Sequence, residues 1–522
     1  MALSRHDLNQ IDDGYIDSLS EAQMHKLCCR LRDDLIELHD RLNQNPSNSS
    51  RPPSSREPWF SYSAADGDEE TDGEAPLLPQ SELDDLTGEG NDDVRNEAPG
   101  SVEKSGKPRK RKAGKQEGTQ GYGRTQKLPI TETIVHRASE CGGCTCKLSE
   151  DAEFIARTGH YVIDIEKDTN ACVGLQVTNT KHLYGDTLCD CGHTTRTMPH
   201  RCEKESNWNV ELTEWRLVGP LLMALICCLA KRMRMSRPRI KEFLYDWPGI
   251  KLAVGTINQC IHEMGYAVSP VEDQLIKEAR ESNLLHADET PWKERGRPLW
   301  LWVFSTVTVT LYLVGKRDMK SIDKVLTDDF DGWLMSDGYR VYRYYKKRLR
   351  CRAHLERKAQ GLKESLNKEA QNFGRETLKV LKTLMDAIYH VREGPSENLV
   401  LKYQELLNQF KIHCEYFRDA KHDKTRALAR EFLNDWETIF RILAHPHLPL
   451  TNNEAERALR HRVILRRINF GTRTPQGTRV FALLASVIET CRKREISPWD
   501  YLANVIFLRR HGYDAIPIPA AA

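Results

Sequence analysis

Three acidic residues of this sequence stand where carboxylates could hold divalent metal ions. Asp288 and Asp337 each follow a short apolar run that reads as a buried strand, and Asp337 leads into a glycine turn. A third acid, Glu456, lies much later, in a stretch that reads as a helix. Two divalent ions about 3.5–4 Å apart need carboxylates that converge from different elements. The pattern predicts a two-metal site for phosphoryl transfer, with these three acids as catalytic residues and metal ligands.

Two glutamates compete for the place of the third ligand. Thr451 and Glu454 have the spacing of a capping box, in which the threonine begins a helix and the glutamate folds back onto its amide. Glu454 would then have a structural task. Glu456 lies beside the apolar line of Ala455 and Leu459, so it can face the edge of a sheet while that line docks on it. We therefore predict Glu456 as the ligand.

The residues around the two aspartates predict a sheet. Segments 298–305 and 308–314 are rich in aromatic and β-branched residues, and they should form a meander with the strand that ends at Asp288. A helical connection over 320–330 should lead to a fourth strand, 333–337, which a crossover makes parallel to a neighbour. A single strand-end aspartate is usually an ordinary turn residue. Two in this order, followed by a helical acid, indicate an RNase H-like core within an α+β multidomain chain.

Helices are predicted between and after the acids. Residues 356–440 carry leucine stripes with few Gly or Pro, which predicts an α-helical insertion before Glu456. An apolar helix should cover 477–491, and a last helix should begin at Ser497 with Pro498 in its first turn.

Arginines gather on both sides of the acids. Their planar guanidinium groups suit phosphate oxygens, so polyanion binding follows. Cys351 and His354 lie three positions apart and share a helical face, and two ligands are too few for a zinc site. We interpret both as packing and hydrogen-bonding support near the active site. The residues predicted to contact DNA are Arg350, Arg352, Arg357, Arg457, Arg460, Arg466 and Arg467.

Cysteines in the first third of the chain predict a structural zinc site. A Cys-x-x-Cys knuckle, Cys141 and Cys144, is answered some forty-five residues later by Cys189 and Cys191. Tetrahedral Zn²⁺ takes two such ligand pairs from two turns. The second pair is irregular, so His193 is an alternative ligand, and Cys146 competes in the first turn.

The first 127 residues predict a helix followed by a linker. From Met24 to Leu42, apolar residues alternate four and three positions apart, as in a coiled-coil seam, although a helix folded onto its own chain would look similar. We expect this helix to join protomers into a homo-oligomer. Residues 51–127 are polar, acidic and then basic, with the run Lys107 to Lys112, and they predict a disordered linker.

A helical region is expected between the cysteines and the first acid. The apolar run from Leu217 to Ala230 reads as a buried helix, because it is too short to span a membrane. Two helices, 237–246 and 254–264, are joined by a Trp-Pro-Gly turn and are compatible with a DNA-binding helix-turn-helix, though any two packed helices would look alike.

Composition sets broad limits. At 522 residues the chain is long enough for three or four domains. The 77 basic and 75 acidic side chains nearly balance, so net charge argues for no particular partner. No secretory signal is visible, so a cytoplasmic protein without membrane contact is expected. In that reducing compartment the 15 cysteines should be free thiols and metal ligands.

Taken together, these motifs closely resemble the IS66 family of bacterial transposases, in particular the long catalytic subunit. The family residue before Ala-Glu-Arg varies, which supports Glu456 over Glu454. The chain departs from the family in its acidic linker, in the close spacing of Cys189 and Cys191, and in Arg352, where the family tends to have Trp. The motifs that carry the resemblance are the cysteine knuckles, Asp288-Glu289-Thr290, Ser336-Asp337-Gly338-Tyr339, Cys351-Arg352-Ala353-His354-Leu355, Asn452-Asn453-Glu454-Ala455-Glu456-Arg457-Ala458-Leu459-Arg460 and Ile488-Glu489-Thr490-Cys491.

The resemblance implies DDE chemistry on DNA. Asp288, Asp337 and Glu456 would hold two Mg²⁺ (or Mn²⁺) ions, and strand cleavage and strand transfer would proceed without a covalent protein–DNA intermediate. The implied partners are the terminal inverted repeats of an insertion sequence, target DNA and small accessory transposition proteins. Two rivals remain: a zinc-containing DNA-binding regulator with an inactive RNase H-like fold, and a purely hydrolytic RNase H-like nuclease.

The expected domain order follows from these segments. It runs as a coiled-coil helix (1–50), a linker (51–127), a zinc-binding module (128–205), a helix-turn-helix-like region (206–270), the first part of the catalytic core (271–358), a helical insertion (359–445), the third-acid helix (446–475) and C-terminal helices (476–522).

Overall fold

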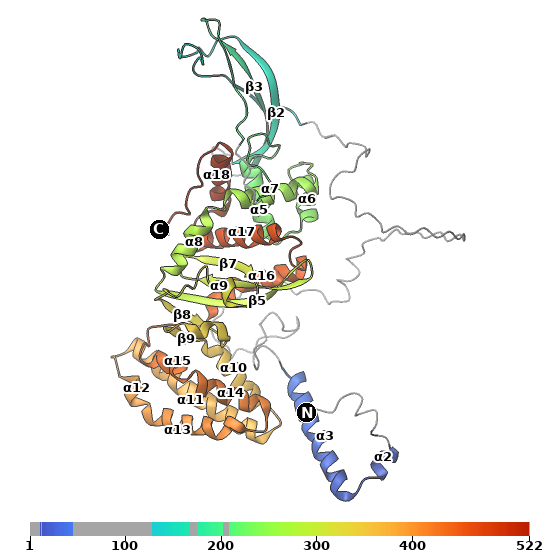
Figure 1. Ribbon diagram of the computed structural model, residues 1–522, viewed down its shortest axis with the longest axis vertical. Helices are drawn as coiled ribbons and strands as arrows, with labels where there is room; N and C mark the ends of the chain where they lie inside the picture. The colour runs from blue at the N-terminus through green and yellow to red at the C-terminus, as the bar shows by residue number, and fades with distance from the viewer. Residues whose placement is uncertain are drawn as a thin grey trace, which may run out of the picture. The chain divides into compact units, whose positions relative to one another are not determined.

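The computed structural model describes Ile11, residues 13–44, Asn48, and residues 128–167, 175–201 and 208–520. The predicted linker, 51–127, therefore lies outside the described residues. The described chain is a mixed α+β structure with two mixed sheets and many helices (Figure 1). No helix in this part of the chain is both long and apolar enough to cross a bilayer. Its cysteines are all free thiols, as predicted.

The larger sheet carries both predicted aspartates. Its strands are β5 (Leu284–Glu294), β6 (Arg297–Ser305), β7 (Thr310–Gly315), β8 (Trp333–Ser336) and β9 (Arg348–Arg350), in the order β7-β6-β5-β8-β9. The first three form an antiparallel meander, and β8 and β9 are added in parallel. The predicted meander and parallel fourth strand are confirmed. Strand β9 was not predicted, because three residues with two arginines carry no strand periodicity.

Strand β5 continues past Asp288, so the predicted end of this strand is wrong. β8 pairs with β5 only from Leu284 to His286, whereas β6 pairs with β5 as far as Glu294. Pro291 has no N–H to donate and is tolerated in the part of β5 that β8 no longer reaches. Asp288 stands just beyond the point where the β8 pairing stops, so its surroundings are still those of a strand end.

One face of the larger sheet is covered by α16 (Asn453–Asn469) and α17 (Pro475–Lys493) (Figure 1). The rings of Trp292 on β5 and Phe481 on α17 stack with centroids 4.4 Å apart. The hydroxyl of Tyr312 on β7 donates to the carbonyl oxygen of Ala458 on α16 at 2.7 Å. These contacts fix α16, which carries Glu456, on the face of the sheet toward which Asp288 points.

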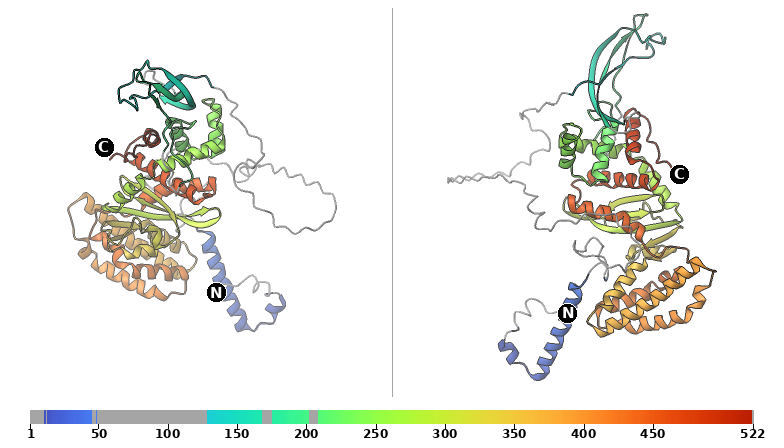
Figure 2. Two further views of the ribbon diagram at one scale, coloured as in Figure 1. Left: turned by 45° about the horizontal axis from the view of Figure 1, so that its top comes forward. Right: turned by 180° about the vertical axis from the view of Figure 1, so that it is seen from behind.

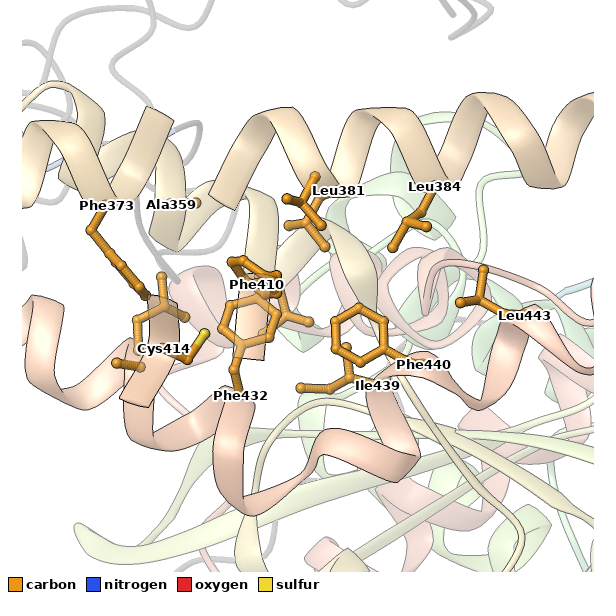
Figure 3. Packing of buried hydrophobic residues seen from close by; sticks show 14 of the residues in the cluster. Ala359, Phe373, Leu381, Leu384, Phe410, Cys414, Phe432, Ile439, Phe440 and Leu443 are labelled. Atoms are coloured by element: carbon orange, nitrogen blue, oxygen red, sulfur yellow. The ribbon is translucent and has the colours of Figure 1, made fainter. Parts of the chain in front are cut away.

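The segment between β9 and α16 is helical, and it has a hydrophobic core of its own (Figure 3). Phe410, Phe432 and Phe440 meet in this core, where the first two rings lie edge to face at 5.1 Å. Figure 2 shows these helices grouped together. The helices are α10 (Arg352–Lys363), α11 (Lys368–Glu393), α12 (Leu399–Lys402), α13 (Gln404–Tyr416), α14 (Asp423–Asn434) and α15 (Trp436–Phe440), with 3-10 turns at Phe417–Asp419 and Arg441–Leu443.

The smaller sheet holds the cysteine turns. It consists of β1 (Glu132–His136), β2 (Phe154–Lys167), β3 (Leu175–Leu188) and β4 (Thr194–Arg196), in the order β1-β3-β2 with β4 on β3. β2 and β3 form a long antiparallel ribbon, whose pairing runs from Phe154 with Thr187 to Lys167 with Leu175. One cysteine pair precedes β2, and the other lies in the turn between β3 and β4.

Helices fill the remaining described chain. The predicted pair is confirmed as α6 (Arg237–Asp246) and α7 (Val254–Ala267), and the predicted buried helix as α5 (Pro220–Lys231). The predicted helix over 320–330 is mostly wrong, since only α9 (Met319–Ile322) forms before the chain turns toward β8. The other helices are α2 (Asp13–Asp17), α3 (Glu21–Leu42), α8 (Val271–Arg280), α18 (Pro498–Arg510) and a 3-10 helix at Arg340–Tyr344.

The N-terminal helix is present with the predicted end. In α3 the seam residues Leu35, Leu38 and Leu42 are 64%, 51% and 75% exposed. Asp40, on the same helix, instead accepts a hydrogen bond from Ser365 of the helical segment at 2.6 Å. The leucine stripe is thus available for contact with a second chain, and such pairing stays a prediction.

Candidate active site

Asp288 lies on β5, and Asp337 directly follows the neighbouring strand β8. Asp288 pairs across the sheet with Val303, which packs against α16 and α17. Asp337 follows the last residue of β8, and its Oδ1 accepts the Tyr339 N–H at 2.8 Å. The next residue, Gly338, lies so close to Arg350 that a Cβ there would sit 2.7 Å from its Nη2. The glycine therefore lets the turn bring Asp337 close to the sheet.

The two aspartates and Glu456 interact electrostatically. Burial raises the pKa of Asp288 well above its ordinary value, and the negative charges of Asp337, Glu289 and Glu456 raise that pKa further. Negative charges that raise the pKa of a neighbouring carboxyl group favour a proton or a cation beside it. The three predicted acids thus come from β5, from the end of β8 and from the first turn of α16, and they share one electrostatic environment.

Glu456 also faces α10. Its Oε1 lies 3.2 Å from Nη2 of Arg357 and 3.6 Å from Nδ1 of His354. The ligand atoms of Cys351, His354 and Glu456 lie within 4.8 Å of one another. In the sequence, Cys351 and His354 alone are too few for a metal site. Glu456 adds a third possible ligand, and Arg357 places a positive charge beside it. Among the described residues, the carboxylate oxygens of Asp288, Asp337 and Glu456 do not form a group within 4.8 Å of one another.

Asn452 connects the parts of the site and was missed in the sequence analysis. Its side chain is fully buried, donates to the carbonyl oxygen of Ala287 at 2.9 Å, and meets Nδ1 of His286 at 3.1 Å. Its backbone N–H donates to the Cys351 sulfur at 3.2 Å. The start of α16 is therefore fixed to β5 directly before Asp288. The only sequence signal was a pair of asparagines ahead of a helix, which reads as an ordinary cap.

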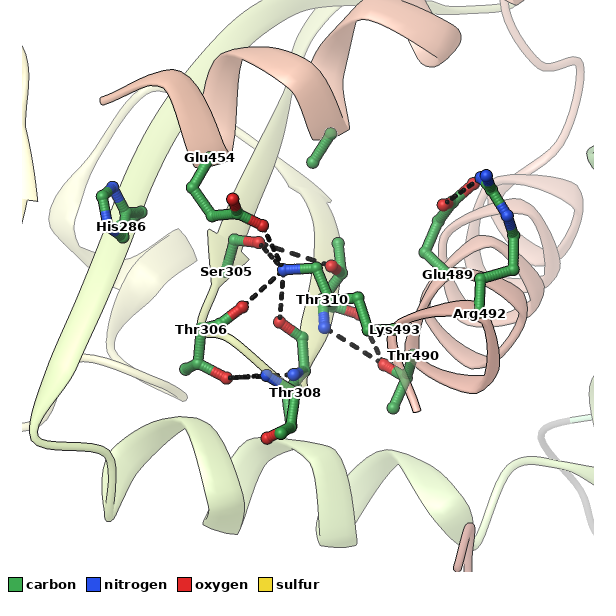
Figure 4. A network of polar contacts seen from close by, with 12 residues as sticks. His286, Ser305, Thr306, Thr308, Thr310, Glu454, Glu489, Thr490, Arg492 and Lys493 are labelled. Carbon is green, nitrogen blue, oxygen red and sulfur yellow. Dashed lines mark hydrogen bonds and ion pairs between the residues drawn. The ribbon is translucent and has the colours of Figure 1, made fainter. Parts of the chain in front are cut away.

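Glu454 has a structural task, but not the predicted one. The helix cap is Asn452, without a side-chain capping bond, so the predicted Thr451–Glu454 capping box is wrong. Glu454 instead pairs with Nζ of Lys493 on α17 at 2.6 Å, and Lys493 also donates to Ser305 Oγ at 2.7 Å (Figure 4). A buried lysine needs a counter-charge. The ion pair therefore turns Glu454 away from the aspartates.

A fourth acid, Glu289, stands beside the site on the other face of β5. Its Oε1 is held by Arg317 Nη2 at 2.6 Å, and its Oε2 accepts the Tyr342 hydroxyl at 2.9 Å. Burial and the charge of Asp337 raise the pKa of Glu289 to about 7 in spite of Arg317. Strand alternation next to Asp288 could have predicted the face that Glu289 occupies, but not its partners.

The predicted DNA-contacting arginines divide into three groups. Arg350 is buried and pairs with Asp435 and Glu431, and Arg352 is buried and pairs with Glu356 at 2.9 Å. Nearer the carboxylates, Arg357 pairs with Glu456, and Arg466 donates to Thr290 Oγ1 at 3.0 Å. Arg457, Arg460 and Arg467 are exposed along α16. The structure thus turns the first two inward and leaves the last three at the surface.

Comparison with known proteins now decides the family. Residues 216–480 match the family model described as "Transposase IS66 family", and this match covers half of the chain. The chain belongs to the IS66 transposase family. A relative from Sinorhizobium fredii (strain NBRC 101917 / NGR234), described as "Uncharacterized protein y4qI", is 23% identical over 315 residues. The alignment covers 54% of this chain and 58% of the relative, so the chain spans less than two thirds of its length.

The matched region contains all three acids of this IS66-family chain, together with Asn452 and Arg317.

The second metal-capable group, formed by the four cysteines, lies before the matched region. Sγ atoms of Cys141 and Cys191 are 3.6 Å apart, those of Cys144 and Cys189 are 3.7 Å apart, and all four lie within 4.8 Å. A tetrahedral ion with bonds of about 2.3 Å separates its sulfurs by about 3.8 Å. The alternates Cys146 and His193 lie outside this group.

Proposed function

We propose that this IS66-family chain is a DDE transposase that cleaves DNA at the ends of an insertion sequence and joins them to target DNA. The observation that carries the proposal is that Asn452, at the start of the helix that bears Glu456, donates to the carbonyl oxygen of Ala287 directly before Asp288. The order of the larger sheet, with an antiparallel meander followed by parallel strands, supports an RNase H-like core. Asp288 on the first strand, Asp337 directly after the fourth and Glu456 on a following helix support this assignment.

The residues present fit divalent cations. Asp288, Asp337 and Glu456 offer oxygen ligands, which Mg²⁺ and Mn²⁺ prefer, and a cation would relieve their mutual repulsion. A pair of ions about 3.5–4 Å apart calls for ligands spread more widely than a single ion does. This agrees with acids that interact without forming one tight cluster. Bound ions would stabilise the charge on the entering and leaving oxygens of phosphoryl transfer.

The chain's own residues would set the reaction geometry. Asp288, Asp337 and Glu456 would hold the ions, and Asn452 would keep Glu456 in register with Asp288. In the first step, water attacks the phosphorus at the element end, and the P–O3′ bond breaks to leave a 3′-hydroxyl. In the second, that hydroxyl attacks a phosphorus of target DNA, and the leaving 3′-oxygen takes a proton. Arg457, Arg460 and Arg467 lie exposed on the same helix and would face the DNA phosphates.

Other parts would serve DNA-end binding and assembly. The Cys141, Cys144, Cys189 and Cys191 group would hold a structural Zn²⁺ ion, and α6 with α7 would contact the terminal repeats. Helix α3 would pair protomers through its exposed leucines. Arg350 and Arg352 are not carried into this proposal as DNA contacts, because both are buried against carboxylates.

The test is strand cleavage of duplexes that span the two boundaries of the DNA element encoding the chain. Glu456→Gln should bind these duplexes yet cut them with Mg²⁺ at least about 100-fold more slowly, because a ligand is lost. Glu454→Gln, two positions away on the same helix, is the matched control and should retain most activity. Equal activity of the two variants would refute the assignment.

A pre-cut end separates the rivals. Supplied with target DNA, the transposase should produce joined strands, whereas a purely hydrolytic nuclease gives none. If the chain is an inactive regulator, wild type and Asp288→Asn should bind the ends equally well, and neither should cut them.

A further inference from the structure

Arg317 is an exposed guanidinium fixed beside the carboxylates, and the function proposed so far leaves it unused. It follows β7, just before α9, and 38% of its side chain is exposed. Its Cζ lies 4.1 Å from the ring centre of Trp300 and 4.0 Å from that of Tyr339. Two aromatic rings thus confine a planar cation that still reaches solvent.

Hydrogen bonds fix the direction of this cation. Nε and Nη2 of Arg317 donate to Oε1 of Glu289 at 3.1 and 2.6 Å. The carbonyl oxygen of Arg317 accepts the Tyr339 hydroxyl at 2.8 Å. One side of the guanidinium is therefore used by Glu289, and among the residues that the structure describes Nη1 has no acceptor. The side chain is already ordered, so binding would lose little conformational entropy.

The position of Arg317 relates it to the acids. Glu289 follows Asp288 in β5, and Tyr339 stands two residues after Asp337. The charge of Asp337 acts on Glu289, so the arginine and its anchor lie beside the carboxylates. DNA with a phosphate at Asp288 and Asp337 has further phosphates on either side of it, and Arg317 offers a cation to one of them.

We propose that Arg317, held by Glu289 and by the rings of Trp300 and Tyr339, binds a DNA backbone phosphate that flanks the cleaved bond. Arg317 is a positioning residue, and Glu289 acts through it. Arginine suits this task because its fork can share N–H groups between a carboxylate and a phosphate. This inference rests on the proposed function, since it takes DNA to be the substrate.

The test is a methylphosphonate scan, in which single phosphates near the end of a boundary duplex are replaced by an uncharged group. Affinity is measured with Ca²⁺ so that the DNA stays intact. Wild type should lose about tenfold in affinity at one flanking position, the scale of a charge-assisted hydrogen bond. Arg317→Ala should bind unmodified DNA about tenfold more weakly and lose nothing further at that position.

Two more variants separate a phosphate contact from a structural role. Arg317→Lys keeps the charge but loses the fork and the ring stacking, so it should recover only part of the affinity. Arg430→Lys is the matched control, because Arg430 is 50% exposed and pairs with Asp419 at 2.7 Å in the helical segment. Its scan should match that of wild type.

Either of two results would overturn the proposal: coinciding profiles for wild type and Arg317→Ala, or a wild-type profile with no sensitive position. If the boundary duplexes are not recognised at all, the proposed function fails instead. In that case the affinity for a duplex of unrelated sequence is measured at several salt concentrations. If Arg317 contacts the backbone, the slope of log affinity against log salt concentration should be shallower by about 0.9 in Arg317→Ala than in wild type.

Discussion

At the scale of single residues, the site depends on Asn452 as much as on the acids. Its amide joins β5 to the start of α16, and its backbone joins both to Cys351. A buried amide that meets a backbone carbonyl and a histidine ring is costly to remove, because its partners stay desolvated. Asn452 therefore sets the distance between Asp288 and Glu456.

Replacing this amide should damage both stability and activity. Asn452→Ala should lower the free energy of unfolding by about 1–3 kcal/mol, and end cleavage should fall about tenfold or more as α16 shifts. Urea denaturation and cleavage rates measure the two effects. Asn453→Ala changes the neighbouring exposed asparagine and serves as the control. A neutral result for Asn452→Ala would show that the link is not needed.

Residue types and spacing identified the acids, but the partners of each side chain were beyond reach of the sequence. One of the grounds for predicting Glu456 and not Glu454 is a capping box that does not form, and Glu454 instead pairs with Lys493. Arg350 reads as a phosphate ligand, because nothing in the sequence places Asp435 or Glu431 opposite it. The partner of Arg352, Glu356, lies four positions away on the same helix, a spacing that the sequence does show. Pairings across 80 or more residues follow only from the fold.

At the scale of elements, buried ion pairs attach the helical segment to the larger sheet. Asp435, between α14 and α15, is 4% exposed and accepts from Arg348 at 2.7 Å and also from Arg350. Burial alone would raise the pKa of Asp435, but the hydrogen bond from Arg348 and the charges of both arginines lower it. Since that pKa lies below its unfolded value, the pair stabilises the protein at neutral pH and is lost in acid.

Removing the charge of Asp435 leaves two buried guanidinium groups uncompensated. Asp435→Asn should therefore destabilise the protein by about 3–5 kcal/mol, measured by chemical denaturation at pH 7. This difference in the free energy of unfolding should become smaller at acid pH, because Asp435 itself becomes protonated in the wild type. Asp419→Asn breaks an exposed pair with Arg430 and should cost about 0–1 kcal/mol. Similar losses in both variants would show that burial of the pair does not matter.

Elements with strong periodicity were predicted well, and short or paired elements were not. The meander, the crossover strand, α6 and α18 follow from apolar patterning and from the handedness of connections. β9 was missed, because its three residues carry no pattern. The length of β5 depends on which neighbour still pairs with it, and that is a property of the sheet and not of the segment.

At the scale of the whole molecule, the sequence separates two kinds of candidate metal ligand along the chain. Soft thiol ligands lie before residue 216 and hard carboxylates lie after it. The sequence alone did not decide which four residues are the ligands, because Cys146 and His193 also had suitable spacing. Folding the β3–β4 turn against the first knuckle places Cys189 and Cys191 beside Cys141 and Cys144.

The zinc prediction follows from that choice. The purified chain should hold one Zn²⁺ per protomer, measured by metal analysis, and Co²⁺ should give a tetrahedral thiolate spectrum. Cys144→Ser should lose the ion, since it removes one of four ligands. Cys146→Ser, in the same turn, should keep it. Loss in both variants, or in neither, would contradict the ligand set.

The central claim is that Asp288, Asp337 and Glu456 gather around the same metal ions. Replacing Mg²⁺ by Fe²⁺ and adding ascorbate with peroxide produces hydroxyl radicals at the bound ion, which cut the polypeptide nearby. Mass spectrometry of the fragments should locate breaks close to residues 288, 337 and 456, and excess Mg²⁺ should suppress all three together. Breaks at one of these positions without the other two, or none that Mg²⁺ suppresses, would contradict the claim.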